Sequence, residues 1–103
     1  MATGTFIPFA NLSGNGSTAA ISLESQVQGT FKGDTESTAQ VVSTVWGTTR
    51  VDLEARLAST LAWAVVEADI AANKIVRIGV AQAVRLTVKT YDGTGTIGGG
   101  VLI

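Results

Sequence analysis

The acidic residues are the side chains whose spacing could support chemistry. They include three pairs set two residues apart: Asp34/Glu36, Asp52/Glu54 and Glu67/Asp69. On a β-strand such pairs share one face, as general acid–base pairs and calcium ligands do. Polar residues on the outward face of any strand have the same spacing, and lysine and arginine lie close to these pairs in the sequence. We therefore expect the carboxylates to be solvated or to form ion pairs with residues on neighbouring strands. The first pair lies in an expected turn and is the one to test for calcium.

The chain lacks the side chains that nucleophilic catalysis commonly uses. Histidine and cysteine are absent, so the sequence offers no imidazole base, no thiolate nucleophile and no His/Cys ligands for zinc or haem. The segment Gly93-x-Gly95-x-x-Gly98 has the spacing of a dinucleotide-binding loop, but only five residues follow it, too few for the helix that the motif requires. We therefore expect no enzyme activity, no cofactor and no metal, and we expect these glycines in a turn and a glycine-rich last strand.

Three aromatic residues, Trp46, Trp63 and Tyr91, could stack on a sugar ring. Trp63 alternates with Leu61 and Val65, which predicts a place in the core. Trp46 stands at an expected strand end, where packing at a rim or an interface is natural. Tyr91 is out of phase with the strand before it and is expected to be exposed. Core and interface roles are favoured over glycan binding, which stays as the alternative.

β-strands are the elements that must position these residues. Alternation of apolar and polar residues, or enrichment in β-branched residues, predicts strands at 21–24, 27–32, 40–46, 75–80, 84–89 and 96–102. The residues of 33–37 and 92–95 are typical of turns.

The stretch from Val51 to Asn73 allows two interpretations. As strands, Val51, Leu53 and Leu57 point inward while the charged residues between them point outward. As a helix, the leucines at 53, 57 and 61 form one stripe with the alanines that follow, and Asn73 is a fair helix end. The residues alone favour neither.

A resemblance favours strands. The segments that carry it are Leu53-Glu54-Ala55-Arg56-Leu57, Trp63-Ala64-Val65-Val66, Ile75-Val76-Arg77-Ile78 and the stretch from Val84 to Ile97. Over residues 50–103 the chain resembles small phage-encoded β-sandwich modules, which are similar to galactose-binding-like jelly rolls. The resemblance implies an all-β, antiparallel, jelly-roll-like sandwich of about eight or nine strands. An α+β fold with a helix in 52–72 is the alternative.

Composition and the chain ends point to assembly. Charged residues make up 15% of the 103 residues, against about 25% in typical domains, so we expect other subunits to cover much of the surface. The net charge of −1 argues against nucleic-acid binding, and no apolar run is long enough for a membrane span. We expect a flexible N-terminal arm at 1–17 and one sandwich domain at 18–103. Apolar and aromatic residues expected at interfaces are Phe6, Phe9, Trp46, Tyr91, Val101, Leu102 and Ile103.

The same resemblance implies a structural virion protein. It would be a decoration or cement protein on the capsid surface, made in the host cytoplasm, that binds the major capsid protein and copies of itself, with a trimer as one oligomeric state. One alternative is a phage tail or fibre-associated carbohydrate-binding module. Another is a structural subunit of a tail, a connector or a shell.

Overall fold

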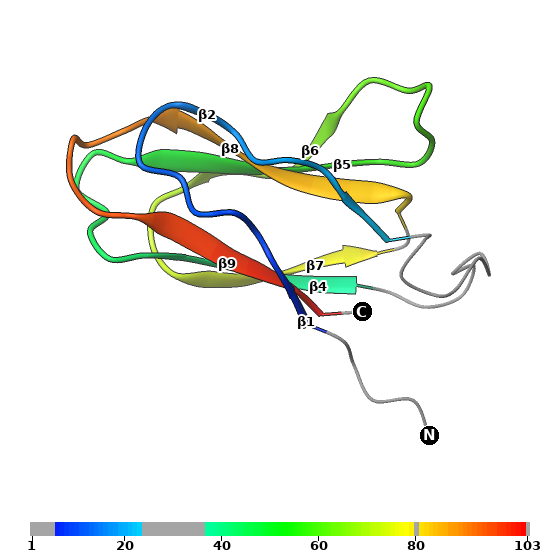
Figure 1. Cartoon of the computed structure of the whole chain (residues 1–103), viewed down its shortest axis with the longest axis horizontal. Helices are drawn as coiled ribbons and strands as arrows, with labels where there is room; N and C mark the ends of the chain where they lie inside the picture. The colour runs from blue at the N-terminus through cyan, green and yellow to red at the C-terminus, as the bar shows by residue number, and fades with distance from the viewer. Residues whose placement is uncertain (1–5, 24–36, 80, 103) are drawn as a thin grey trace.

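A computed structural model of the chain describes residues 6–23, 37–79 and 81–102. These residues form two antiparallel sheets that face each other as two layers (Figure 1). The four-stranded sheet has the order β1 (Phe6–Pro8), β9 (Ile97–Leu102), β4 (Ser37–Ser43) and β7 (Lys74–Gly79). The five-stranded sheet has the order β2 (Gly16–Ser17), β8 (Ala83–Thr90), β5 (Arg50–Arg56) and β6 (Ala64–Ile70), and β3 (Ile21–Ser22) also pairs with β8.

The connections make this sandwich a jelly roll. The chain crosses between the sheets from β4 to β5, from β6 to β7 and from β8 to β9. Two sheets with the strand orders 1-9-4-7 and 2-8-5-6 are the jelly-roll arrangement. The expected all-β sandwich is therefore confirmed, and the alternative with a helix in 52–72 is wrong.

Pairing with β8 explains why the ambiguous stretch forms strands. Val51, Leu53 and Ala55 lie opposite Val88, Leu86 and Val84, and all six side chains are buried on the inner face of the sheet. Such cross-strand apolar pairs stabilise a sheet more than local helix propensity stabilises a short isolated helix. The leucines at 57 and 61, which would complete the helical stripe, lie after β5 and are exposed.

Residues 6–17 are part of the sandwich. Ile7 pairs with Val101, and the backbone N–H of Phe9 donates to the carbonyl of Gly99 at 2.9 Å. The side chain of Phe9 is buried in the core. The described part of the expected arm, 6–17, thus runs along the sandwich, because its hydrogen bonds and its buried phenyl ring tie it to β9.

The inner faces of the two sheets form one hydrophobic core. Its fully buried large side chains include Leu23, Val41, Leu53, Leu86, Ile97 and Val101. Among the residues that the structure describes there is no helix, and hence none long and apolar enough to cross a membrane.

Candidate interaction surface

The two sheets differ sharply in charge. The strands of the four-stranded sheet contain two charged residues, Lys74 and Arg77, both on β7. The strands of the five-stranded sheet contain eight: Arg50, Asp52, Glu54, Arg56, Glu67, Asp69, Arg85 and Lys89. Lys74 also turns away from the outer surface of its own sheet, because its Nζ binds Glu67 on β6.

The outer surface of the four-stranded sheet is therefore a low-charge face. Its residues alternate with the buried Ala39, Val76 and Val101, and the strand register arranges them in rows across the sheet, two of which carry its exposed hydrophobic side chains. One row is Phe6, Leu102, Thr38 and Arg77, and the other is Pro8, Gly100, Gln40 and Ile75.

Three large hydrophobic side chains stand out on the low-charge face. Phe6 is 56% exposed, Ile75 is 66% exposed and Leu102 is 49% exposed. Burying a side chain of this kind is worth about 1.5 to 3 kcal/mol relative to leaving it in water. Among the described residues of this surface the strands add one outward charge, Arg77, and three exposed hydrophobic side chains beside it mark the surface as one suited to contact with another protein.

A shallow hollow lies between these side chains. Its volume is about 180 Å³, and it is lined by Phe6, Thr38, Ala39, Gln40, Ile75, Gly100 and Leu102. Gly100 makes room for the ring of Phe6, because a Cβ at Gly100 would overlap that ring and would lie 2.6 Å from the carbonyl oxygen of Ile7. The missing side chain lets the Phe6 ring lie against β9.

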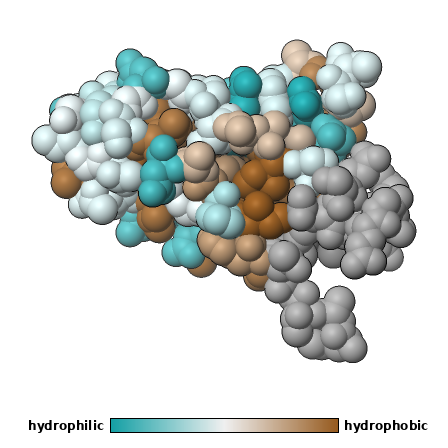
Figure 2. Space-filling view, in the orientation of Figure 1, coloured by the Kyte–Doolittle hydropathy of each residue, from teal (hydrophilic) through white to brown (hydrophobic). Residues whose placement is uncertain are grey.

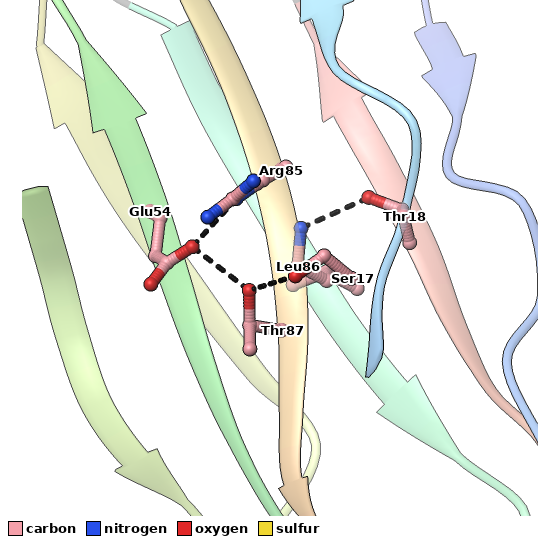
Figure 3. Close-up of polar contacts among 6 residues, drawn as sticks. All are labelled: Ser17, Thr18, Glu54, Arg85, Leu86 and Thr87. Carbon is pink, nitrogen blue, oxygen red and sulfur yellow. Dashed lines mark hydrogen bonds and ion pairs between the residues drawn. The ribbon is translucent and has the colours of Figure 1, made fainter. Parts of the chain in front are cut away.

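The opposite surface, on the five-stranded sheet, is polar, and its side chains form hydrogen bonds with one another (Figure 3). Glu54 Oε1 accepts hydrogen bonds from Arg85 Nε at 2.7 Å and from Thr87 Oγ1 at 2.8 Å. The hydroxyls of Ser17 and Thr87 lie 2.7 Å apart, and since Thr87 donates to Glu54, Ser17 donates to Thr87. These bonds connect β2, β8 and β5 across the sheet.

A second polar cluster surrounds Lys89. Its Nζ lies 2.5 Å from Asp69 Oδ1 and 3.1 Å from Asp52 Oδ1, which also accepts the backbone N–H of Asp69. Asp69 has a φ of 55°, in the left-handed region that aspartate tolerates better than most residues. Its hydrogen bond with Lys89 holds the pKa of Asp69 below its ordinary value of 3.8 and raises the pKa of Lys89.

Cross-strand ion pairing thus accounts for the carboxylate pairs that the structure describes. Asp52, Glu54, Glu67 and Asp69 each bind a lysine or an arginine on another strand, as expected. The pair at 34 and 36 lies outside the described residues. Among those residues, no three His, Cys, Asp or Glu side chains are grouped as metal ligands would be.

Trp63 is not in the core, contrary to its alternation with Leu61 and Val65. The guanidinium carbons of Arg56 and Arg85 lie 4.4 and 4.5 Å from the centre of its ring. Both arginines stand on the outer surface of the five-stranded sheet, so Trp63 covers charged side chains through cation–π contacts. Leu61 is exposed because residues 57–63 lead around the end of the sandwich, and Val65 is exposed because it lies opposite Glu54 on the outer surface of the five-stranded sheet.

Trp46 and Tyr91 lie in two loops at one end of the sandwich, 44–49 and 91–96. Both are half-buried against the core. Trp46 Nε1 donates to Asn73 Oδ1 at 2.8 Å, and the Tyr91 hydroxyl donates to the carbonyl of Gly95 at 2.7 Å. Figure 2 shows weakly polar residues over this end and hydrophobic residues gathered nearer the middle of the same face. Tyr91 is less exposed than expected because its hydroxyl closes its own turn.

Asp92 connects these two loops. Its Oδ1 accepts the backbone N–H and the hydroxyl of Thr48, each at 3.0 Å, and its Oδ2 accepts the hydroxyl of Thr94 at 3.1 Å. The backbone hydrogen bond from Thr48 is the main cause that lowers the pKa of Asp92 below 3.8. A carboxyl whose pKa is lowered by folding stabilises the folded state above its unfolded pKa and loses that contribution as the pH falls.

Asp92→Asn is therefore expected to lower stability near neutral pH and to have little effect in acid. The urea midpoints of the wild type and the variant, measured from pH 7 down to about pH 2.5, should differ at neutral pH. The difference should shrink once the pH falls below about 4, as the wild-type carboxyl becomes protonated. A difference that stays constant over this range would contradict the role of the charge.

A larger hollow, of about 320 Å³, lies at the other end of the sandwich. Residues from β5, β6 and β7, from the 57–63 connection and from the link between β7 and β8 line it, and nearly all are apolar: Ala55, Arg56, Leu57, Leu61, Ala62, Ala64, Val66, Ile78 and Ala81. Leu57 is 69% exposed at its rim, so this end of the sandwich adds a second apolar surface.

The structure separates the residues expected at interfaces. Phe6 and Leu102 are exposed and lie opposite each other in register on the low-charge face. Phe9 and Val101 are buried in the core, so the expectation that they touch a neighbour is wrong for this fold. Trp46 and Tyr91 lie at the far end, and Ile103 lies outside the described residues.

Ile75 is the exposed residue of the low-charge face that the sequence reasoning missed. The sequence predicts a strand at 75–80. Alternation within it separates Ile75 and Arg77 from the buried Val76, and this signal was available in the sequence.

Comparison of the chain with protein-family models, with curated proteins and with solved structures finds no match.

Proposed function

We propose that this chain is a structural protein of a virion, a decoration or cement protein that binds the outside of a capsid and bridges neighbouring subunits. Its partners would be the major capsid protein and further copies of the chain. The protein would be made in the host cytoplasm and would end on the capsid surface. The resemblance of residues 50–103 to phage β-sandwich modules supports this choice of setting.

The contrast between the two sheet surfaces is the observation that carries the proposal. A free protein is expected to present charge on all sides, but here the strands of one sheet hold eight charged residues and those of the other hold two. Phe6, Ile75 and Leu102 are exposed on the second. A surface of this kind gains stability when a neighbouring subunit covers it.

Such a protein acts by burying apolar surface against its neighbours. Each copy contributes a modest apolar contact, and many copies on one lattice act together, since linked binding sites raise the overall affinity far above that of one contact. The ion-paired surface of the five-stranded sheet would face solvent and keep the decorated particle soluble.

Sedimentation with capsids tests the proposal. Purified chain is mixed with capsids of the virus that encodes it, stripped of this protein, and the mixture is centrifuged through a glycerol cushion. We expect the wild type to pellet with the capsids to a fixed number of copies per particle. Ile75→Glu should need at least tenfold more protein for the same occupancy, because one buried charge without a partner costs more than 1.4 kcal/mol.

Leu57→Glu is the matched control, because Leu57 is as exposed as Ile75 but lies at the end of the sandwich. It should pellet like the wild type. Wild-type chain that stays in the supernatant at saturating concentration would overturn the proposed function.

A further inference from the structure

The larger hollow is an apolar recess with one charged residue, Arg56, in its lining. It lies where the edge strands of the two sheets meet, because Val66 belongs to β6 and Ile78 to β7, and both side chains pack against the core. Its volume of about 320 Å³ falls within the range of small-molecule pockets, about 300 to 1,000 Å³. None of its lining residues belongs to the two rows of the low-charge face, so the hollow is a separate surface.

The rim of the larger hollow holds exposed leucines. Leu57 and Leu61 are 69% and 51% exposed, because the connection that carries them swings out beyond the end of β5 (Figure 1). Contact with water is unfavourable for side chains of this kind. An apolar chain that lies in the hollow and covers the two leucines therefore gains binding energy from surface that the fold leaves exposed.

Arg56 brings a positive charge to this apolar recess without an acid to balance it. Lys74, Arg85 and Lys89 each bind a carboxylate on a neighbouring strand, whereas no carboxylate of the described residues lies within ion-pair distance of Arg56. A recess that combines apolar walls with an unpaired guanidinium is complementary to an anion that carries an apolar group. The smaller hollow has no charged residue in its lining and lacks this feature.

Two contacts hold the Arg56 side chain in place. Its Nε donates to Gln82 Oε1 at 3.2 Å, and its Cζ lies 4.4 Å from the centre of the Trp63 ring. The two Nη groups have no hydrogen-bond partner among the residues that the structure describes. A cation–π contact leaves such N–H groups available, and together they can bind both oxygens of one carboxylate. A side chain that is already held loses little freedom when it binds a ligand.

The volume of the larger hollow sets the length of the apolar group. A methylene group takes up about as much room as a water molecule in the liquid, about 30 Å³. A hollow of about 320 Å³ therefore has room for about ten carbon atoms. A single unbranched chain of this length fits, and a folded segment of another protein does not.

We propose that the larger hollow binds a free aliphatic carboxylate of about eight to ten carbon atoms, with its chain among the apolar residues and its carboxylate on Arg56. This binding site goes beyond the proposed function and does not depend on it, since the hollow and the low-charge face lie on different parts of the sandwich.

NMR titration of isotope-labelled protein with sodium octanoate tests the site. We expect saturable shifts of the backbone amide signals of Leu57, Leu61 and Ala62, with a dissociation constant on the order of 1 mM or below. The amide signals of Trp46 and Asp92, at the other end of the sandwich, should not move. Acetate has the carboxylate without the chain, and octylammonium has the same chain with the opposite charge. Each should bind at least tenfold more weakly than octanoate, because both parts of the site are needed.

Arg56→Gln tests the role of the charge. It removes the guanidinium and keeps most of the side-chain stem, so the dissociation constant for octanoate should rise at least tenfold. Arg50→Gln is the matched control, because Arg50 begins the same strand, forms no ion pair among the described residues and is absent from the lining of the hollow. It should bind octanoate like the wild type, and the dispersion of the amide signals should show both variants folded.

Three results would overturn the site. The first is a wild type without saturable shifts at ten times the expected dissociation constant. The second is a set of shifts that maps away from residues 57–62. The third is octanoate binding that Arg56→Gln leaves unchanged, or that octylammonium equals, since the carboxylate would then have no partner in the hollow. Sedimentation with capsids is independent of these measurements, so either proposal can fail while the other stands.

Discussion

Gly99→Ala is expected to lower the free energy of unfolding by about 4 kcal/mol or more, one of the largest effects that a single methyl group can have in this chain. Gly99 has a φ of +118°, which residues with a side chain rarely adopt. A Cβ at this position would overlap the carbonyl oxygen of Gln40 on β4. Neither β9 nor β4 can shift, because each is hydrogen-bonded on both sides.

Urea denaturation followed by tryptophan fluorescence measures the loss. Gly14→Ala is the matched control, since a Cβ there meets no atom within 4 Å, and its effect should stay within about 0.5 kcal/mol. Equal midpoints for Gly99→Ala and the wild type would show that β9 and β4 do not approach each other as described.

Leu53→Ala and Leu86→Ala are each expected to cost about 2 to 5 kcal/mol. Both side chains are fully buried, and they lie opposite each other on β5 and β8, at the middle of the five-stranded sheet. Truncation removes apolar contacts and leaves a cavity that two paired strands cannot close. Because the total stability of a domain is about 5 to 15 kcal/mol, either variant should lose a large share of the free energy of unfolding.

Leu57→Ala is the control for this pair, because Leu57 is 69% exposed directly after β5. Its effect should remain within about 0.5 kcal/mol. The double variant Leu53→Ala/Leu86→Ala should lose less than the sum of the single losses, because residues in contact share one cavity. If Leu57→Ala cost as much as Leu53→Ala, the core would not lie between β5 and β8.

The low charge of the chain takes a specific meaning from the fold. Spread evenly, so few charges would leave both surfaces of the sandwich weakly polar. The strands instead place eight on the five-stranded sheet, where Glu54 with Arg85 and Lys89 with the aspartates form ion pairs. The shortage of charged residues is therefore confined to the four-stranded sheet. For this reason the outer surface of that sheet is the candidate binding surface.

Local pattern was sufficient for much of the fold. The alternation of Val84, Leu86 and Val88 with Arg85, Thr87 and Lys89 predicts a half-buried antiparallel strand, and β8 is that strand. The glycines at 93 and 95 predict a turn, and both have positive φ. These features depend on a few consecutive residues, so the sequence carries them without knowledge of any partner strand.

The state of the stretch from Val51 to Asn73 depended on distant residues. Helix and strand patterns both fit its leucines, and β8, about thirty residues further along the chain, decides between them by offering Val84, Leu86 and Val88 as partners. The same dependence misplaced Trp63. Alternation predicts it in the core, but residues 57–63 lead around the end of the sandwich and the ring lies against Arg56 and Arg85.

By itself, the sequence determined that this protein is built from strands, that it lacks histidine and cysteine chemistry, and that its charges are too few for an evenly polar surface. Tertiary structure alone decided which apolar residues are core and which are surface. Phe6 and Phe9 are three residues apart in one short segment, and Val101 and Leu102 are adjacent. Successive residues of a strand point to opposite faces. Only pairing with β9 and β4 fixes which face is buried, so Phe9 and Val101 entered the core while Phe6 and Leu102 remained outside beside Ile75.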